Sequence, residues 1–297
     1  MNTKKLSKPA ETPLKKVLIL GCQGTLGQAL VAEFNLPEYI VVGWDRNEAD
    51  VTSAQIGRRV IAQKPDIIIN ATGYNAVDKA ETDEAEKAKC FQLNSFTPGK
   101  LAKASKEIGA IFVNYSSDYV FRGDKIEGYA ENDRPDPISV YGQSKWEGEK
   151  FVAVVGGKYY VIRPSRLFGP SDKTANAKKS FVDIMVEKKN DGKIKVVNEE
   201  EGCPTYSLDL AYFTRLLVEQ KKPYGIYHGV NSGSCNWYGW AGEIFKILNK
   251  QPKLIPVLAS EFPRAAKRPL YSVLLNTKTE PMRSWQEALV AYLSSLA

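Results

Sequence analysis

Tyr141 and Lys145 lie four residues apart in the stretch SVYGQSKWEGEK (139–150), and a pair of this kind could transfer a proton. A helix would place both side chains on one face. The ammonium of Lys145 would then lower the pKa of the Tyr141 phenol from about 10 toward neutrality. Ser117 follows an apolar run and adds a hydroxyl that could hydrogen-bond a substrate carbonyl. Such Tyr–Lys pairs are also common on protein surfaces, so the rest of the chain has to support this interpretation.

Several other chemistries are excluded by composition. The 297 residues include a single histidine, His228, and four cysteines that are far apart with no C-x-x-C pair. Metal sites and nucleophile schemes that depend on histidine are therefore not expected, and we predict no bound metal. The formal net charge of +7 permits an anionic ligand. Because acidic residues are interspersed among the basic ones, we do not expect nucleic acid as a partner.

Short apolar segments alternate with longer helical patterns over the first half of the chain. The apolar segments are near-continuous runs rich in Val and Ile, which is typical of parallel strands covered on both faces. We predict an α/β fold, a Rossmann-like doubly wound parallel sheet with a smaller C-terminal substrate-binding lobe. Residues 1–15 would form a flexible tail, 16–169 the NAD(P)-binding domain, and 170–297 a substrate lobe interleaved with segments that return to the sheet. The predicted strands are 16–20, 39–44, 66–70, 110–117 and 159–163, and the predicted helices include 26–34, 53–63, 83–108 (ended by Gly109), 180–189 and 285–296.

The loop GCQGTLGQAL (21–30) stands directly between the first predicted strand and the first predicted helix. Glycine permits a tight turn and lets backbone N–H groups approach a pyrophosphate at the helix N-terminus. We therefore predict a dinucleotide site here, formed by Gly21, Gly24, Thr25, Leu26 and Gly27.

Asp45 stands at the end of the second predicted strand, 24 residues after the first glycine of the loop, and Arg46 follows it directly. A carboxylate at this place can bind the adenosine ribose of NADH, whereas a guanidinium can bind the 2′-phosphate of NADPH. The choice between NADPH and NADH stays open. Asp50 and Val51 follow closely and could border the adenine.

Ser117 and Asp118 are expected at the carboxyl end of the fourth strand, where ligands bind in open α/β sheets. Together with Tyr141, Lys145 and the glycine loop, they make the chain resemble the extended short-chain dehydrogenase/reductases. Within that group it is most similar to the dTDP-4-dehydrorhamnose reductase family, over residues 16 to the C-terminus. The matching stretches are NATGYNAVDKAE (70–81), YSSDYVFRG (115–123), PISVYGQSKWEGE (137–149), GCPTYSLDLA (202–211), GIYHGVNSGSCNWYGWA (225–241) and RPLYSVL (268–274).

The resemblance implies that NADPH or NADH delivers hydride to the C4 ketone of a dTDP-linked 4-keto-6-deoxy sugar. Tyr141 would protonate the oxyanion, Lys145 would assist it and hold the nicotinamide ribose, and Ser117 would orient the ketone. Asp118 would line the sugar pocket, and Arg166 stands where the family usually has a Trp facing the sugar. Arg268 could pair with a diphosphate through its guanidinium. The resemblance also assigns to the cofactor groove Ala71, Thr72, Gly73, Tyr74, Asn94 and Ser165.

Two alternatives to this reductase remain. One is another nucleotide-sugar reductase or epimerase, and the other is a non-catalytic subunit like the regulatory subunit of methionine adenosyltransferase, which resembles the same family. The expected partners are a dTDP-sugar substrate and, in a possible homodimer, a second copy of the chain. We expect neither nucleic acid nor a membrane as a partner. No signal peptide or long apolar run is found, so we expect a cytoplasmic protein. Trp237 is expected to pack within the second lobe rather than to bind a ligand.

Overall fold

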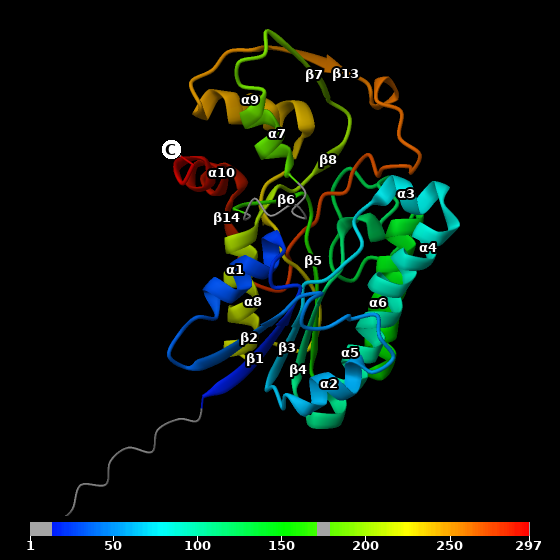
Figure 1. Ribbon diagram of the computed structural model, residues 1–297. Coiled ribbons are helices and arrows are strands. Elements are labelled where there is room, and N and C mark those ends of the chain that lie inside the picture. Colours follow the sequence, from blue (N-terminus) through cyan, green and yellow to red (C-terminus); the bar gives the residue numbers. More distant parts are fainter. Residues whose placement is uncertain (1–13, 171–178, 297) are drawn as a thin grey trace, which may run out of the picture.

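A six-stranded parallel sheet forms the centre of the molecule (Figure 1). The computed structural model describes residues 14–170 and 179–296, so most of the predicted tail lies outside the described residues. The strand order β10-β5-β4-β3-β1-β2 confirms the doubly wound α/β fold. The first strand begins at Lys15, inside the segment predicted as tail. The strands are β1 (Lys15–Leu20), β2 (Tyr39–Trp44), β3 (Ile67–Asn70), β4 (Ile111–Tyr115), β5 (Tyr159–Arg163) and β10 (Gly225–His228).

Helices cover both faces of this sheet, which explains why its strands are apolar at successive positions. In β1, Val17 and Ile19 pack on one face, while Leu18 and Leu20 pack on the other. The first face is covered by α1 (Thr25–Glu33) and α8 (Ser207–Glu219). The opposite face is covered by α2 (Ile56–Ala62), α5 (Thr97–Ile108) and α6 (Val140–Val155).

The helix predicted over 83–108 is wrong as a single regular element. Asp83 caps α4 (Glu84–Phe91) by accepting a hydrogen bond from the Glu86 amide, and a π-helical turn, η1 (Gln92–Phe96), joins α4 to α5. A short helix that the sequence analysis missed, α3 (Val77–Thr82), precedes them. A π turn adds one residue to a helical turn without interrupting the helix, so a periodic apolar pattern does not reveal it. The predicted C-cap is confirmed, because Gly109 adopts a left-handed conformation with φ of 72°.

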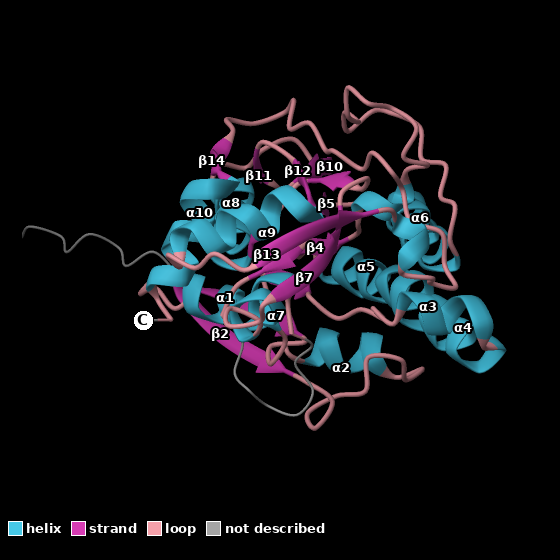
Figure 2. Ribbon diagram, turned by 90° about the horizontal axis from the view of Figure 1, so that it is seen from above, coloured by secondary structure: helices cyan, strands magenta, loops and turns pink. Residues whose placement is uncertain are grey.

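A second lobe lies over the carboxyl ends of the strands (Figures 1 and 2). Its core is rich in aromatic side chains, including Phe168, Tyr206 and Trp240. The strands of this lobe pair as β13 (Lys253–Val257) with β7 (Lys193–Val197), β6 (Leu167–Phe168) with β9 (Thr205–Tyr206), β8 (Glu201–Gly202) with β12 (Cys235–Asn236), and β11 (Asn231–Ser232) with β14 (Met282–Ser284). Its helices are α7 (Phe181–Glu187), α9 (Trp237–Ile247) and α10 (Trp285–Ser294).

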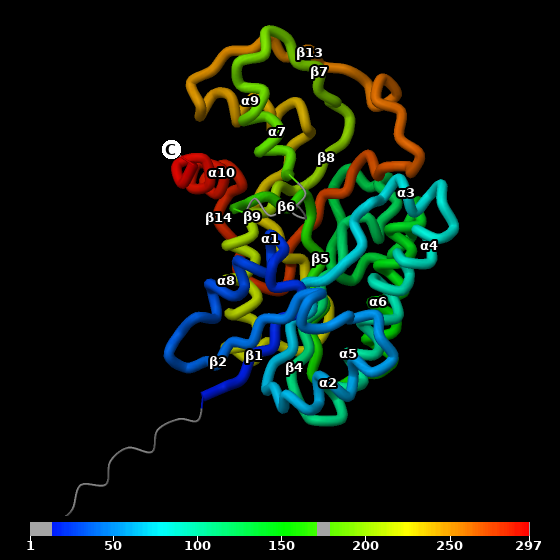
Figure 3. The backbone as a smooth tube through the Cα atoms, in the orientation of Figure 1, coloured from blue at the N-terminus to red at the C-terminus, as the bar shows by residue number. Residues whose placement is uncertain are grey.

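The segment 262–275, here called the strap, leads from the second lobe back along α3 to the sheet (Figure 3). It is joined to α3 by two hydrogen bonds onto Asp78, one from the Ala266 amide and one from the Arg268 guanidinium. Short 3-10 turns, η2 (Asp118–Val120) and η3 (Ala259–Glu261), follow β4 and β13 respectively. Within the described residues, no helix has the length and apolar character needed to cross a membrane.

Candidate active site

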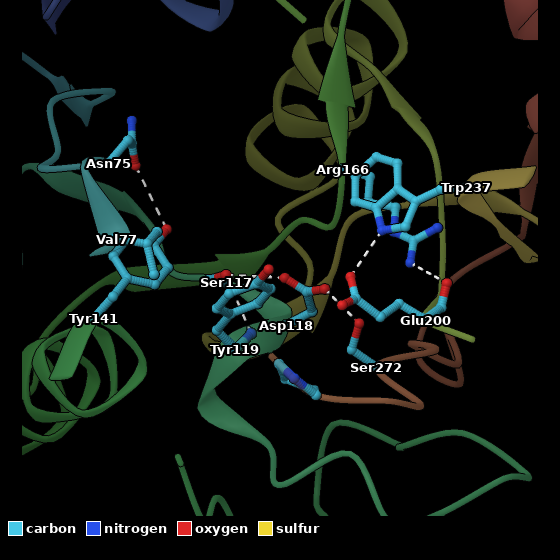
Figure 4. A pocket seen from close by; sticks show the side chains of 11 residues that line it. Asn75, Val77, Ser117, Asp118, Tyr119, Tyr141, Arg166, Glu200, Trp237 and Ser272 are labelled. Carbon is cyan, nitrogen blue, oxygen red and sulfur yellow. Dashed lines mark hydrogen bonds between the residues drawn. The ribbon is translucent and has the colours of Figure 1, made fainter. Parts of the chain in front are cut away.

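A pocket of about 200 Å³ opens between the carboxyl ends of the strands and the second lobe (Figure 4). Four residues predicted for the site, Ser117, Asp118, Tyr141 and Arg166, line it together. They come from three segments, namely the end of β4, the start of α6 and the loop after β5. The remaining lining residues are Asn75, Val77, Tyr119, Glu200, Trp237, Pro269 and Ser272.

Tyr141 and Lys145 share one face of α6, as their spacing predicted. Ser139 caps this helix by accepting a hydrogen bond from the Gly142 amide, which sets its first turn beside the pocket. The Tyr141 ring packs edge-on against Tyr119, and its Oη lies 3.5 Å from Asn75 Oδ1. The Nζ of Lys145 lies 6.0 Å from the centre of the Tyr141 ring and donates a 3.1 Å hydrogen bond to the Tyr115 carbonyl.

The predicted direction of the Tyr141 pKa is wrong. Burial raises the pKa of Tyr141, because a phenolate in this apolar environment loses the solvation of its charge, and a hydrogen bond with the Ser117 hydroxyl opposes this rise only in part. Burial also lowers the pKa of Lys145, to about 8, against the opposing influence of Cys90 and Glu149. Desolvation therefore outweighs the interactions that favour the charged form of each side chain.

The glycine loop after β1 is folded tightly in the way a pyrophosphate cradle requires. Gly21 has φ of +79°, and a Cβ at Gly27 would lie only 1.9 Å from the Gly21 carbonyl oxygen. Gly24 is the N-cap of α1, with no side chain to satisfy the first amides of the helix, while Thr25 and Leu26 form its first turn. Those amides have no partner within the helix, so they are available to an anion.

Of the four residues predicted after β2, only Asp45 is hydrogen-bonded to this loop. The Asp45 carboxylate accepts hydrogen bonds from the Gln23 amide of the loop at 3.1 Å and from the Arg46 amide at 2.7 Å. The Arg46 side chain is exposed. Asp50 accepts hydrogen bonds from the amide and hydroxyl of Thr52, and Val51 packs against the core beneath α2 and α5.

The segment after β3 connects the glycine loop to the Tyr–Lys pair. A Cβ at Gly21 would contact Ala71 and Thr72, and a Cβ at Gly73 would lie 3.1 Å from the Nζ of Lys145. Asn94 holds this segment in place from the π turn: its Oδ1 accepts a hydrogen bond from the Tyr74 amide, and its Nδ2 donates to the Tyr74 carbonyl. The segment after β3 thus links the glycine loop to Lys145.

These features fit a nicotinamide dinucleotide. The glycine loop offers backbone donors for a pyrophosphate, and Gly73 leaves the space beside the Lys145 ammonium free of a side chain. Ser165, which is predicted for the cofactor groove, is buried, and its hydroxyl donates to Asp118. Within residues 14–170 and 179–296, no three His, Cys, Asp or Glu side chains gather in a group that could hold a metal ion.

Arg166 forms one wall of the pocket rather than folding away. Its guanidinium stacks over Trp237, 4.0 Å from the ring centre, and donates hydrogen bonds to the backbone carbonyls of Cys235 and Glu200. The indole N–H of Trp237 donates to the buried Glu200 carboxylate, which also pairs with Arg264. This wall of the pocket therefore combines an aromatic ring with the cation stacked over it.

Arg268 is not among the residues that line the pocket. Its guanidinium donates to Asp78 at 2.7 Å and to the Ala266 carbonyl at 3.0 Å, so it fastens the strap to α3. The neighbouring Pro269 does line the pocket.

The lining residues that sequence reasoning missed share one property: they reach the pocket only through tertiary contacts. Asn75 and Val77 follow β3 within the matched stretch 70–81, and Ser272 lies in the matched stretch 268–274, so the resemblance did contain a signal for them. Trp237 was assigned to packing and lines the pocket instead. Nothing in the local sequence distinguishes it from Trp240, which is buried in the core of the second lobe.

Comparison with known proteins identifies similar chains along almost the whole length. The family model described as "RmlD substrate binding domain" matches residues 15–297. A Streptomyces antibioticus protein named "Probable dTDP-4,6-dihydroxy-2-methyloxan-3-one 4-ketoreductase" is 36% identical over 283 residues, which are 92% of this chain and 92% of that protein. A dTDP-4-dehydrorhamnose reductase of Burkholderia thailandensis is 33% identical over 278 residues, covering 88% of this chain and 90% of the relative.

A solved structure is similar in three dimensions as well. The dTDP-4-dehydrorhamnose reductase of Bacillus anthracis, crystallised in complex with NADP, superposes with a TM-score of 0.88 at 35% identity. The match covers 95% of this chain and 99% of that one.

Proposed function

The chain belongs to the RmlD substrate binding domain family, and from that premise we propose that it reduces the C4 ketone of dTDP-4-dehydrorhamnose with NADPH or NADH. The observation that carries this proposal is the assembly of Ser117 and Tyr141 in the wall of one pocket, with Lys145 beside them and the glycine loop at the same edge of the sheet. The product would be dTDP-L-rhamnose, which makes the chain an NAD(P)H-dependent oxidoreductase.

In this proposal each side chain has a separate part in the reaction. When bound, reduced nicotinamide would supply the hydride that C4 receives. Tyr141 donates its phenolic proton to the oxygen of C4. Ser117, whose only hydrogen goes to Asp118, would act on the Tyr141 phenol and keep it directed at that oxygen. The raised pKa of Tyr141 suits this role, because it keeps the phenol protonated until an alkoxide, a much stronger base, forms beside it. The Lys145 ammonium then stabilises the phenolate that is left.

Cofactor and substrate have separate proposed subsites. The glycine loop and the segment Ala71–Tyr74, held by Asn94, would bind the dinucleotide. Asp45 and Arg46 would contact the adenosine ribose. The sugar would lie between Tyr141 and the Arg166–Trp237 wall, and Arg268 would reach the diphosphate only after leaving Asp78. The other residues proposed for the cofactor groove are Asp50, Val51 and Ser165.

A second candidate is the same reduction on a different dTDP-linked 4-keto-6-deoxy sugar. Arg166 stacked on Trp237 favours it, because this cation faces the pocket where the family usually has a Trp. The Streptomyces antibioticus relative is named as a ketoreductase of another dTDP-linked ketone. Sugar identity is therefore the part of the proposal that most needs measurement.

The test is oxidation of NADPH and of NADH, followed by nicotinamide absorbance, with dTDP-4-dehydrorhamnose as substrate. Wild-type protein should turn over, and Tyr141→Phe should lower kcat by a factor of about 10² to 10⁴, since it removes the proton donor but keeps the ring. Unchanged cofactor affinity in Tyr141→Phe would show that the variant is folded. Cofactor binding without turnover in the wild type would contradict this substrate and favour the second candidate.

We further propose that the chain forms a homodimer through an exposed apolar patch on η1 and α6. The patch consists of Phe96, Phe151 and Val154, all exposed, and the first two rings pack 5.8 Å apart. A cytoplasmic location is also proposed. It is supported by the cysteines, since all four lie within the described residues and all four are free thiols, as expected in a reducing compartment.

A further inference from the structure

Asp118 is a carboxylate surrounded by hydroxyl groups. It is only 4% exposed, and three serine side chains donate hydrogen bonds to it. Ser117 Oγ donates to Oδ1 at 2.9 Å, while Ser165 Oγ and Ser272 Oγ donate to Oδ2 at 2.8 and 2.7 Å. The three donors come from the end of β4, the loop after β5 and the strap, so one carboxylate joins three segments around the pocket. Figure 4 shows two of these donors, Ser117 and Ser272, beside Asp118.

These contacts leave Asp118 little capacity for a substrate. Both of its oxygens already accept hydrogen bonds, and a carboxylate has about four acceptor positions in all. Burial raises the pKa of Asp118, whereas the three hydroxyls and the charge of Arg166 act in the opposite direction and favour the ionised form. Asp118 therefore lines the pocket with most of its acceptor positions already occupied.

The same contacts determine how the Ser117 side chain is held. A serine hydroxyl has one hydrogen, and Ser117 donates it to Asp118. The Ser117 oxygen also accepts the Tyr119 amide at 3.2 Å. Ser117 is thus held from both sides in the wall of the pocket that Tyr141 also lines. Its hydroxyl opposes the rise that burial causes in the pKa of the Tyr141 phenol. Without Asp118 the hydroxyl would be free to rotate to another staggered rotamer.

We propose that Asp118 is a positioning residue that acts through Ser117: its carboxylate holds the Ser117 hydroxyl in the orientation that faces Tyr141, instead of binding the sugar. This inference rests on the proposed reductase function and revises the role that the family resemblance implied for Asp118. Since catalytic groups displaced by about 1 Å can cost two orders of magnitude in rate, loosening Ser117 should be visible in kcat.

The test is a double-mutant cycle of Asp118→Asn and Ser117→Ala, measured by steady-state kinetics and by cofactor binding. Asp118→Asn keeps the size of the side chain and one acceptor oxygen but removes the charge that holds the hydroxyl. We expect it to lower kcat at least tenfold, with the KM for the sugar and the Kd for NADPH changed by less than about twofold. In the Ser117→Ala background, the same substitution should have little further effect.

Two results would overturn the proposal. A higher KM with unchanged kcat would mean that Asp118 binds the sugar directly. An equal loss of kcat in both backgrounds would mean that Asp118 acts independently of Ser117. Asp66→Asn serves as the matched control, because Asp66 is a carboxylate at the amino end of β3, where it accepts the Lys16 amide.

A second readout does not depend on turnover. With ¹³Cζ-labelled tyrosine and Tyr141→Phe to identify the resonance, Asp118→Asn should shift the Tyr141 signal, and most of that shift should vanish in the Ser117→Ala background. If the wild type fails to reduce the sugar, the proposed function fails, yet this spectrum still decides the role of Asp118. If Asp118→Asn does not fold, Ser272→Ala takes its place, because it removes a donor to Oδ2 of Asp118. It should lower kcat in the wild-type background and have little effect in the Ser117→Ala background. An equal loss of kcat in both backgrounds would refute the proposal.

Discussion

Lys145 and Tyr141 show how burial sets the chemistry of single residues in this protein. The pKa of each side chain moves in the direction that favours its neutral form, upward for the phenol and downward for the ammonium. The two shifts have opposite consequences for the reduction. They keep the proton on Tyr141, where it is needed, but bring the loss of the Lys145 charge within reach of mildly alkaline pH.

The pH dependence of activity follows from Lys145. Its pKa in the folded protein is about 8, so the ammonium predominates below that pH and is lost as the pH rises through it. We expect kcat/KM to fall above pH 8, approaching a tenfold loss per pH unit, because kcat/KM reports the ionisation of the free enzyme. A profile that stays flat through pH 8 and beyond would contradict the assignment of Lys145.

Stability should respond to pH in the opposite sense. Lys145 has a usual pKa of 10.5 when unfolded and about 8 when folded, so between these values the unfolded state binds more protons. The free energy of unfolding contributed by this residue therefore increases as the pH rises through that window. Urea denaturation of wild type and Lys145→Met, compared across the window, isolates this contribution, since the methionine variant lacks it.

At the scale of elements, close backbone contacts position the site. Gly27 lets α1 begin against the glycine loop, and Gly148 lets α6 approach the π turn, since a Cβ there would lie 2.1 Å from the Asn94 carbonyl oxygen. The π turn in turn directs the Asn94 side chain toward the Tyr74 backbone. The loop, the helix with the Tyr–Lys pair and the segment after β3 are in this way held at fixed distances from each other.

The two glycines of the loop should differ sharply when each is replaced by alanine. A Cβ at Gly27 would overlap the Gly21 carbonyl oxygen at 1.9 Å, whereas a Cβ at Gly24 would meet the same oxygen at an ordinary 3.5 Å. We expect Gly27→Ala to lower the free energy of unfolding by roughly 2–3 kcal/mol. Gly24→Ala is the matched control and should cost less than about 1 kcal/mol. Urea denaturation measures both, and equal losses would contradict the close approach.

At the scale of the whole molecule, two lobes and a strap enclose the pocket. The sheet side contributes Ser117 and Tyr141, the second lobe contributes Trp237, and the strap contributes Ser272. The salt bridge between Arg268 and Asp78 fastens the strap across to α3. The pocket therefore exists only when all three parts are folded together.

The proposed homodimer is a prediction at this scale. Val154 is 85% exposed on α6, beside Phe151 and Phe96, and a glutamate within a buried interface would carry an unpaired charge. We expect the wild type to be a dimer by light scattering, and Val154→Glu to be a monomer with an unchanged circular dichroism spectrum. Ile126→Glu is the control, because Ile126 is an exposed apolar residue in the loop before α6. A monomeric wild type would refute the proposal.

The sequence by itself determined the features that depend on neighbouring residues. The alternation of apolar and helical segments predicted the doubly wound sheet, which is confirmed, and local spacing placed Tyr141 and Lys145 on one face of a helix. The family resemblance is confirmed by the comparisons. These predictions are confirmed because turn geometry, helical periodicity and strand burial depend on residues that are close together in the sequence.

Only the tertiary structure decided what depends on distant residues. It brought Trp237 and Ser272 into the pocket, placed Arg166 over an aromatic ring, and inserted a π turn into a helix that looked regular. It also reversed the expected pKa direction of Tyr141. The physical reason is the same throughout: burial and contact energies depend on which parts of the chain meet after folding, and a local pattern carries no measure of the solvent that those contacts exclude.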